Sequence, residues 1–113
     1  MTWNFRITVR GRFSELDEDQ RRSLRAAQDD HDMLSARFSP EGTFLYTPEL
    51  VNYQHRFLIT GDEADRDDAE TLANIRAEEL SAADLASRGL DGRTISVSAV
   101  CVEDIKVRPG VRR

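Results

Sequence analysis

Apolar and polar residues alternate along the first part of the chain. Between Trp3 and Phe13 the apolar side chains fall on odd-numbered positions, with Asn, Arg and Thr between them. A period of two is typical of a β-strand that buries one face. The sequence therefore predicts a strand over Trp3–Phe13 whose even-numbered side chains point away from the core.

Two later stretches repeat at the spacing of a helix. Asp17, with Gln20 three residues on, is a helix N-cap signature, and apolar positions follow at three- and four-residue steps as far as Leu34. A second, alanine-rich stretch over Ala69–Arg88 is stopped by Gly89. We expect an amphipathic helix after Asp17 and a longer helix over Ala69–Arg88.

Short extended runs fill the rest of the chain, over Ala36–Ser39, Thr43–Thr47, Tyr53–Thr60 and Arg93–Asp104. The resulting order, β-α-β-β-α-β with an extra short hairpin strand, predicts an α+β fold of the ferredoxin-like, split βαβ type. Such a fold has an antiparallel sheet with two helices on one face. We expect one domain over residues 1–105, followed by a flexible basic tail over residues 106–113.

The net charge and the composition disfavour several classes of function. Sixteen basic and twenty-one acidic residues give a net charge of −5, which disfavours nucleic acid and anionic membranes as partners. No run approaches the roughly 20 apolar residues of a membrane helix, and the first residues lack a secretory signal pattern. With Cys101 as its one cysteine, which we assign to the core, the chain is expected in the cytoplasm.

Motifs for cofactors and metals are missing from the sequence. It has no glycine-rich phosphate loop, nucleophile elbow or His/Cys metal spacing. The acidic residues between Asp62 and Glu70 lack the glycine and late glutamate of a calcium-binding loop, and a helix dipole explains them. We therefore expect neither a cofactor nor a metal.

The outward face of the sheet offers candidate ligand-binding residues. Arg6, Thr8 and Arg10 share this face and lie about 6.5–7 Å apart along their strand. With Ile95 and Val97 assigned to the core, the neighbouring strands add further polar residues to the same face: Gln54, Arg56, Ser96 and Ser98. These residues are predicted to bind a substrate carboxylate, while ion pairs within the chain or with a partner subunit, or a solvated face, remain open.

Two histidines are candidates for moving protons, because histidine changes charge near neutral pH. His31 lies near the end of the first helix, where a capping role is the alternative. His55 alternates with Phe57, which also fits a buried structural histidine. Both are retained as candidate general acids or bases.

Four more residues complete the candidate set. Glu78 and Glu79 lie within the second helix. Burial of one of them beside the apolar stripe would raise the pKa of its carboxyl group and favour a role as a general acid. The alternative is that both lie on a solvated face of the helix. Tyr46 and Tyr53 flank the loop that begins at Pro48 and are predicted to line a pocket at the rim of the sheet.

Several short motifs, in this order and spacing, resemble a known family. They are Phe5-Arg6-Ile7-Thr8-Val9-Arg10-Gly11, His31-Asp32-Met33-Leu34 before Phe38, Pro40-Glu41-Gly42, His55-Arg56-Phe57 and Ser87-Arg88-Gly89. The chain resembles a small actinobacterial family of about 110 residues that has no known function. The resemblance implies an actinobacterial cytoplasmic protein, of a kind sometimes found beside natural-product genes, and it carries over no catalytic residue.

Three hypotheses of function follow. The first is a dimeric small-molecule-binding protein, which as an enzyme would be a cofactor-free acid–base catalyst of cyclisation, isomerisation or condensation, for example of the Pictet–Spengler type. The second is a non-enzymatic homodimeric module that pairs through its open sheet face. The third, an acylphosphatase-like hydrolase, is weakened because Ser14-Glu15-Leu16-Asp17 replaces a phosphate-binding loop.

Overall fold

The structure, a computed structural model, describes residues 2–31 and 37–104. Its elements in chain order are strand β1 (Trp3–Phe13), helix α1 (Glu18–Ala26), the short 3₁₀ helix η1 (Gln28–His31), strands β2 (Thr43–Tyr46) and β3 (Asn52–Gly61), helix α2 (Arg66–Ser87) and strand β4 (Gly92–Cys101).

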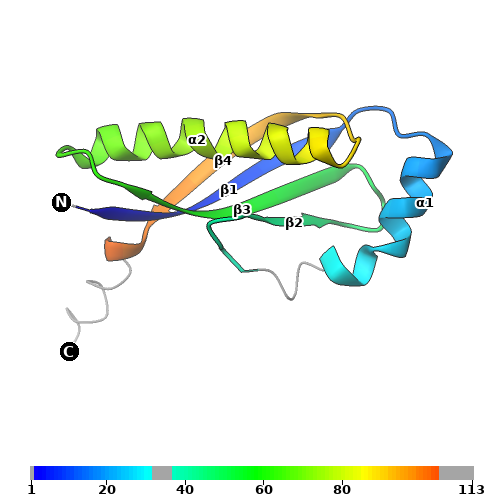
Figure 1. Ribbon diagram of the computed structural model, residues 1–113, viewed down its shortest axis with the longest axis horizontal. Helices are drawn as coiled ribbons and strands as arrows, with labels where there is room; N and C mark the ends of the chain where they lie inside the picture. The colour runs from blue at the N-terminus through cyan, green and yellow to red at the C-terminus, as the bar shows by residue number, and fades with distance from the viewer. Residues whose placement is uncertain (1, 32–36, 105–113) are drawn as a thin grey trace.

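The four strands form one antiparallel sheet in the order β2-β3-β1-β4 (Figure 1). The first strand lies between the third and the fourth, and all three pairings are antiparallel. This order is the one expected of a split βαβ unit, in which each helix connects two parallel strands with a third strand between them. The predicted α+β class and ferredoxin-like arrangement are confirmed.

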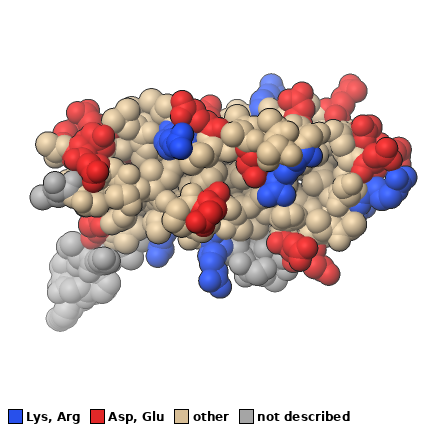
Figure 2. Space-filling model, viewed as in Figure 1, with Lys and Arg blue, Asp and Glu red and all other residues tan. Residues whose placement is uncertain are grey.

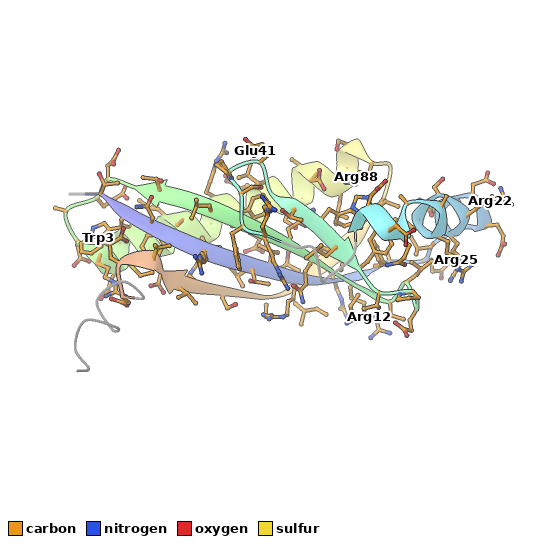
Figure 3. The ribbon with its side chains drawn as sticks, turned by 90° about the horizontal axis from the view of Figure 1, so that it is seen from below. Trp3, Arg12, Arg22, Arg25, Glu41 and Arg88 are labelled. Atoms are coloured by element: carbon orange, nitrogen blue, oxygen red, sulfur yellow. The ribbon has the colours of Figure 1, made fainter. Side chains whose placement is uncertain are left out.

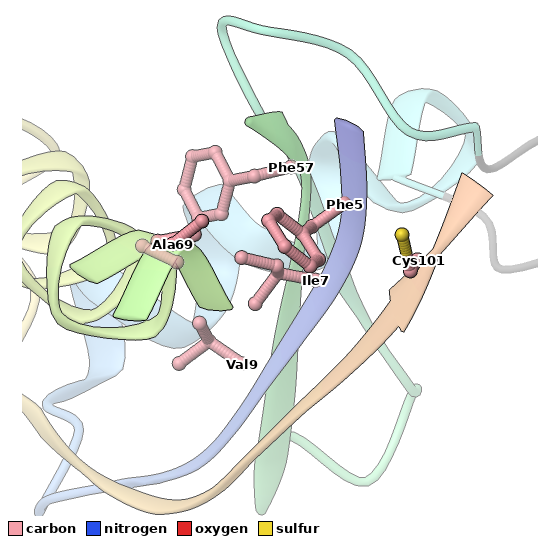
Figure 4. Packing of buried hydrophobic residues seen from close by; sticks show 8 residues of the cluster. Phe5, Ile7, Val9, Phe57, Ala69 and Cys101 are labelled. Carbon is pink, nitrogen blue, oxygen red and sulfur yellow. The ribbon is translucent and has the colours of Figure 1, made fainter. Parts of the chain in front are cut away.

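Helix α2 packs across one face of the sheet and forms the main core with it (Figure 4). Alanine recurs every fourth residue along α2, at Ala69, Ala73 and Ala77, and each of these side chains is buried. Small side chains let the helix backbone approach the sheet closely. The odd-numbered side chains of β1 fill the interface, as the alternation predicts.

Helix α1 does not lie on that face. It sits beyond one end of the sheet, where Figure 1 shows it next to the end of α2. Its nine residues bury one side chain, Leu24, so it has no apolar stripe with which to cover a sheet. The predicted capping box of Asp17 and Gln20 is present, but the α-helix ends at Ala26 and continues as η1 to His31. The predicted extension to Leu34 lies outside the described residues.

Two strand predictions also need correction. Within the expected run Ala36–Ser39, of which Ala36 is outside the described residues, Ser39 forms an isolated bridge to Phe57 rather than part of a strand. Ile95 was assigned to the core, but its side chain is 57% exposed. The register of β4 against β1 shifts beside Arg10, so that Ile95 faces no partner residue there. The predicted tail over residues 106–113 lies outside the described residues.

Candidate functional site

A cavity of about 350 Å³ lies between α1, η1, β2 and the C-terminal end of α2. Its walls combine ring side chains with one cation, one carboxylate, which pairs with Arg22 outside the lining, and a few small polar groups. The lining residues are Asp19, Gln20, Ser23, Leu24, Ala27, His31, Phe44, Tyr46, Arg88 and Leu90. A cavity of this size, with apolar and aromatic walls and convergent polar groups, is a candidate small-molecule site.

Hydrogen bonds fix the two helical segments against the sheet and so preform the cavity. The Gln28 side chain donates to the Tyr46 carbonyl at 3.0 Å, and the Tyr46 hydroxyl donates to the Leu24 carbonyl. At the other side, the Gln20 side chain donates to the Gly89 carbonyl at 2.9 Å, just past the end of α2. The displacement of α1 from the sheet face therefore creates the cavity.

His31 is held in the cavity wall by a backbone contact. Its Nδ1 lies 3.0 Å from the carbonyl oxygen of Phe44, and its ring packs against the rings of Phe44 and Tyr46. Because a carbonyl oxygen can only accept, the neutral ring must carry its proton on Nδ1. Nε2 is then the basic nitrogen of His31, and it has no hydrogen-bond partner among the described residues.

Arg88 supplies the positive charge of the cavity. Its Nε donates to Asp84 Oδ2 at 2.8 Å, and its guanidinium carbon lies 4.5 Å from the centre of the Phe44 ring. These two contacts set the plane of the guanidinium but occupy only one of its five N–H donors. The remaining donors are available to an anionic group in the cavity.

Behind this wall, His55 is buried in the core between two side chains of α2. Its Nε2 lies 2.8 Å from Asp84 Oδ2, and its Nδ1 lies 2.7 Å from the Ser81 hydroxyl. The imidazole also stacks between Phe44 and Phe57, with ring centres 5.0 and 5.8 Å away. His55 thus belongs to a polar chain, Ser81–His55–Asp84–Arg88, that ends at the cavity.

The ionisation of this chain follows from its surroundings. Burial lowers the pKa of His55, although the neighbouring Asp84 opposes the shift. Burial acts to raise the pKa of Asp84, but hydrogen bonds from Arg88 and His55 outweigh it, and the net shift is downward. An ionised Asp84 requires the proton of neutral His55 on Nε2, so Ser81 must donate its hydroxyl proton to Nδ1.

Although serine, histidine and aspartate occur together here, they do not form a nucleophilic site. The Ser81 side chain is 1% exposed and lies on the core side of α2, where no substrate can reach it. The chain reaches the surface only at its other end, where the side chains of Asp84 and Arg88 are 32% and 37% exposed. These four residues therefore orient Arg88. A catalytic group would have to be one of the side chains that line the cavity.

A family model matches residues 1–113, and its description is a family of unknown function, DUF6204. The chain belongs to this family. No curated protein and no solved structure matches the chain. Within residues 2–31 and 37–104, no helix is long and apolar enough to span a membrane, and no group of His, Cys, Asp and Glu side chains could hold a metal ion.

In this DUF6204 chain, the sheet separates His55, one of the two candidate catalytic histidines, from the predicted binding residues. His55 faces α2, whereas its neighbours Gln54 and Arg56 face the opposite side. The register aligns the other predicted binding residues with them on the open face: Arg6, Thr8, Arg10, Ser96 and Ser98. The two groups cannot contact the same ligand.

The remaining candidates of the DUF6204 chain are spread over different places. Glu78 and Glu79 are both exposed on α2, and Glu79 pairs with Arg76 at 3.8 Å. Tyr46 lines the cavity between α1 and the end of α2, which does not include the loop that begins at Pro48. Tyr53 is 2% exposed and packs in the core, with one edge at a smaller hollow of the open face.

Sequence reasoning missed the residues that surround His55 in this DUF6204 chain. Ser81, Asp84 and Arg88 are three and four residues apart, a spacing that places them on one side of a helix. That spacing was a usable signal. It could not show which strand residue faces this side, because the pairing of α2 with β3 depends on the tertiary fold.

Proposed function

We propose that this chain binds a small aromatic carboxylate in the cavity between α1 and the end of α2. The observation that carries the proposal is the position of Arg88 over Phe44, in a cavity whose other rings are His31 and Tyr46. The rings offer stacking surface to a planar ligand, and the guanidinium offers paired N–H donors to its carboxylate. The chain has fifteen arginines and one lysine, a ratio that fits a GC-rich, actinobacterial genome. We therefore propose that the ligand is a metabolite of an actinobacterial cytoplasm.

The fixed orientation of Arg88 supports this ligand class. A flexible arginine loses side-chain freedom on binding, whereas Asp84 already holds this guanidinium in place. A carboxylate that approaches it meets a charge-assisted, two-point contact in a partly dehydrated site. Neutral aromatic ligands would lack this contact and should bind more weakly.

The same cavity supports a cofactor-free proton-transfer reaction. His31 presents Nε2 as its basic nitrogen, since Nδ1 donates to Phe44. In a bound ligand with an acidic C–H bond next to a carbonyl, Nε2 would take the proton, and the resulting imidazolium would return it to the same carbon or to the oxygen of the enolate. Isomerisation, and cyclisation or condensation through such a carbanion, all begin with this step.

Binding can be tested with phenylpyruvate, benzoate and benzyl alcohol as probes. We expect the two acids to raise the melting temperature and benzyl alcohol to have a smaller effect. The variant Arg88→Gln should weaken phenylpyruvate binding about tenfold or more, because one charge-assisted contact is worth about 1.5–3 kcal/mol. Arg25→Gln, which neutralises an exposed arginine of α1 outside the cavity lining, is the matched control and should change the Kd less than twofold.

The proton-transfer step has a separate measurement. Exchange of the methylene protons of phenylpyruvate with deuterated water, followed by NMR, should be faster with the protein than in buffer. His31→Gln should remove this acceleration while phenylpyruvate still binds. The binding proposal would be contradicted if neither acid bound, or if Arg88→Gln and Arg25→Gln lowered the affinity for phenylpyruvate equally. If phenylpyruvate bound but its proton exchange were not accelerated, only the proposal of proton transfer would be contradicted.

A further inference from the structure

The charged side chains within the four strands of this protein all have the same sign. None of the four strands contains an aspartate or a glutamate, although the chain has twenty-one acidic residues. The strands contain instead Arg6, Arg10, Arg12, Arg56 and Arg93. An acidic protein therefore has a sheet whose only charged residues are arginines.

All five of these arginines lie on the open face, which we call the arginine face. Arg6, Arg10 and Arg12 occupy even-numbered positions of β1, opposite in phase to the buried Phe5, Ile7 and Val9. Arg56 pairs with Thr8 across the β1–β3 ladder, and Arg93 pairs with Arg12 across the β1–β4 ladder. In Figure 2 blue side chains project below the body of the molecule, on the side away from α2.

None of the five arginines of this face forms an ion pair with a carboxylate among residues 2–31 and 37–104. The arginine–carboxylate pairs there involve Arg22, Arg66, Arg76 and Arg88. Arg10 instead contacts the Ser98 hydroxyl at 3.4 Å, and Arg56 donates to the Gln54 side chain at 3.3 Å. The direct pairing of Arg12 with Arg93 places like charges opposite one another, which destabilises a sheet unless an anion lies nearby.

We infer that the arginine face binds an extended acidic peptide segment of a partner protein. Arginines two residues apart on β1 are separated by about 6.5–7 Å, which is also the separation of alternate side chains in an extended peptide. Alternate carboxylates of the partner can thus each meet a guanidinium. Exposed apolar side chains at Ile95 and Val100, 57% and 50% exposed, offer contacts for the apolar residues of the same segment.

Other occupants fit this face less well. Two copies stacked face to face would place arginines against arginines. Single-stranded nucleic acid relies on exposed aromatic side chains for base stacking. The outward positions of the described strands carry none, and the half-buried ring of Phe38, which lies over this face, already contacts the guanidinium groups of Arg6 and Arg56 at 5.9 and 5.7 Å. The net charge of −5 also repels a long phosphate chain that extends past the face.

The test uses a fluorescently labelled peptide of alternating Glu and Val residues, with the corresponding Lys–Val peptide as its counterpart. We expect the Glu–Val peptide to bind with an affinity that falls as salt rises, and the Lys–Val peptide not to bind. Arg10→Glu and Arg56→Glu should each weaken binding about tenfold. Arg25→Glu makes the same charge change on α1, which lies beyond the end of the sheet (Figure 3), and should have less than a threefold effect.

Melting temperatures establish that each variant is folded, and Arg6→Glu is the substitute where one is not. The inference is overturned when the Glu–Val peptide does not bind at low salt, or when Arg25→Glu weakens binding as much as Arg10→Glu. It is also overturned when oligothymidylate binds the same arginines more tightly than the peptide. Sedimentation showing a dimer that Arg10→Glu dissociates and that excludes the peptide would identify a second copy as the occupant instead.

Discussion

His55 Nε2 and Asp84 Oδ2 lie 2.8 Å apart and connect the core of the protein to the wall of its cavity. The imidazole is buried between two phenylalanine rings, whereas the carboxylate reaches the surface and holds Arg88. A change inside the core at His55 is therefore transmitted, through Asp84, to the orientation of the cation that we propose binds ligand.

Removal of the Ser81 hydroxyl should destabilise the fold although it removes one atom. In Ser81→Ala, Nδ1 of His55 loses the donor that lies 2.7 Å away and becomes a buried acceptor without a partner. We expect a loss of about 1–3 kcal/mol in the free energy of unfolding, measured by urea denaturation. Because alanine is the better helix former, Ser23→Ala on the exposed side of α1 is the matched control and should be neutral or stabilising. Equal effects of the two substitutions would show that the hydroxyl contact contributes nothing.

Stability should fall as the solution becomes acidic below about pH 6.5. The pKa of His55 is lower in the folded protein than its ordinary value of 6.5, because burial disfavours the imidazolium. The unfolded chain therefore binds the proton first, and the stability present above pH 6.5 is lost as the pH falls through the folded pKa. Urea midpoints at pH 7.5 and 5.5 should differ more for the wild type than for His55→Gln, which has no titrating ring. The same pH dependence in both proteins would assign it to other groups.

The alternation of β1 was enough to predict which side chains of this strand are buried and which face outward. Each odd-numbered apolar residue from Phe5 to Val9 is fully buried, and Arg6 and Arg10 are exposed, as expected. Strand periodicity is a local property, and a slip of one residue would reverse the whole pattern. The strand order followed equally well from the order of elements along the chain.

The position of α1 could not be predicted in the same way. Its capping box defines where the helix begins, but Leu24 is its one buried side chain. Because the apolar contacts of α1 are so few, side-chain hydrogen bonds from Gln20 and Gln28 determine where the helix lies. The cavity exists because of this location. For the same reason, sequence reasoning named His31 and Tyr46 separately but did not bring them together with Arg88.

Gly11 should tolerate no side chain, because Tyr53 packs directly over it. A methyl group at this position would lie 2.1 Å from Cζ of the Tyr53 ring, which is 2% exposed and cannot move into solvent. We expect Gly11→Ala to cost about 1–3 kcal/mol, as overpacking of a core does. In a Tyr53→Leu background the same substitution should cost clearly less, because the ring is gone. An unchanged cost in that background would mean that the backbone, and not the ring, demands glycine.

The carboxylate of Glu103 fastens the chain after β4 to the first residues of β1. Its two oxygens accept from the backbone N–H and the side-chain amide of Asn4, both at 3.0 Å. These hydrogen bonds lower the pKa of Glu103 from 4.5 to about 2. The unfolded chain protonates Glu103 near pH 4.5, whereas the folded protein keeps the carboxylate ionised down to about pH 2. The stability that these hydrogen bonds provide is therefore complete above about pH 4.5 and is lost as the pH falls toward 2.

The variant Glu103→Gln puts an amide NH₂ where one acceptor was, so we expect a lower urea midpoint at pH 6 and convergence with the wild type near pH 2. Glu15→Gln, at an exposed position without a hydrogen bond among the described residues, should follow the wild type throughout. Parallel curves for wild type and Glu103→Gln down to pH 2 would show that the ionised carboxylate does not stabilise this junction.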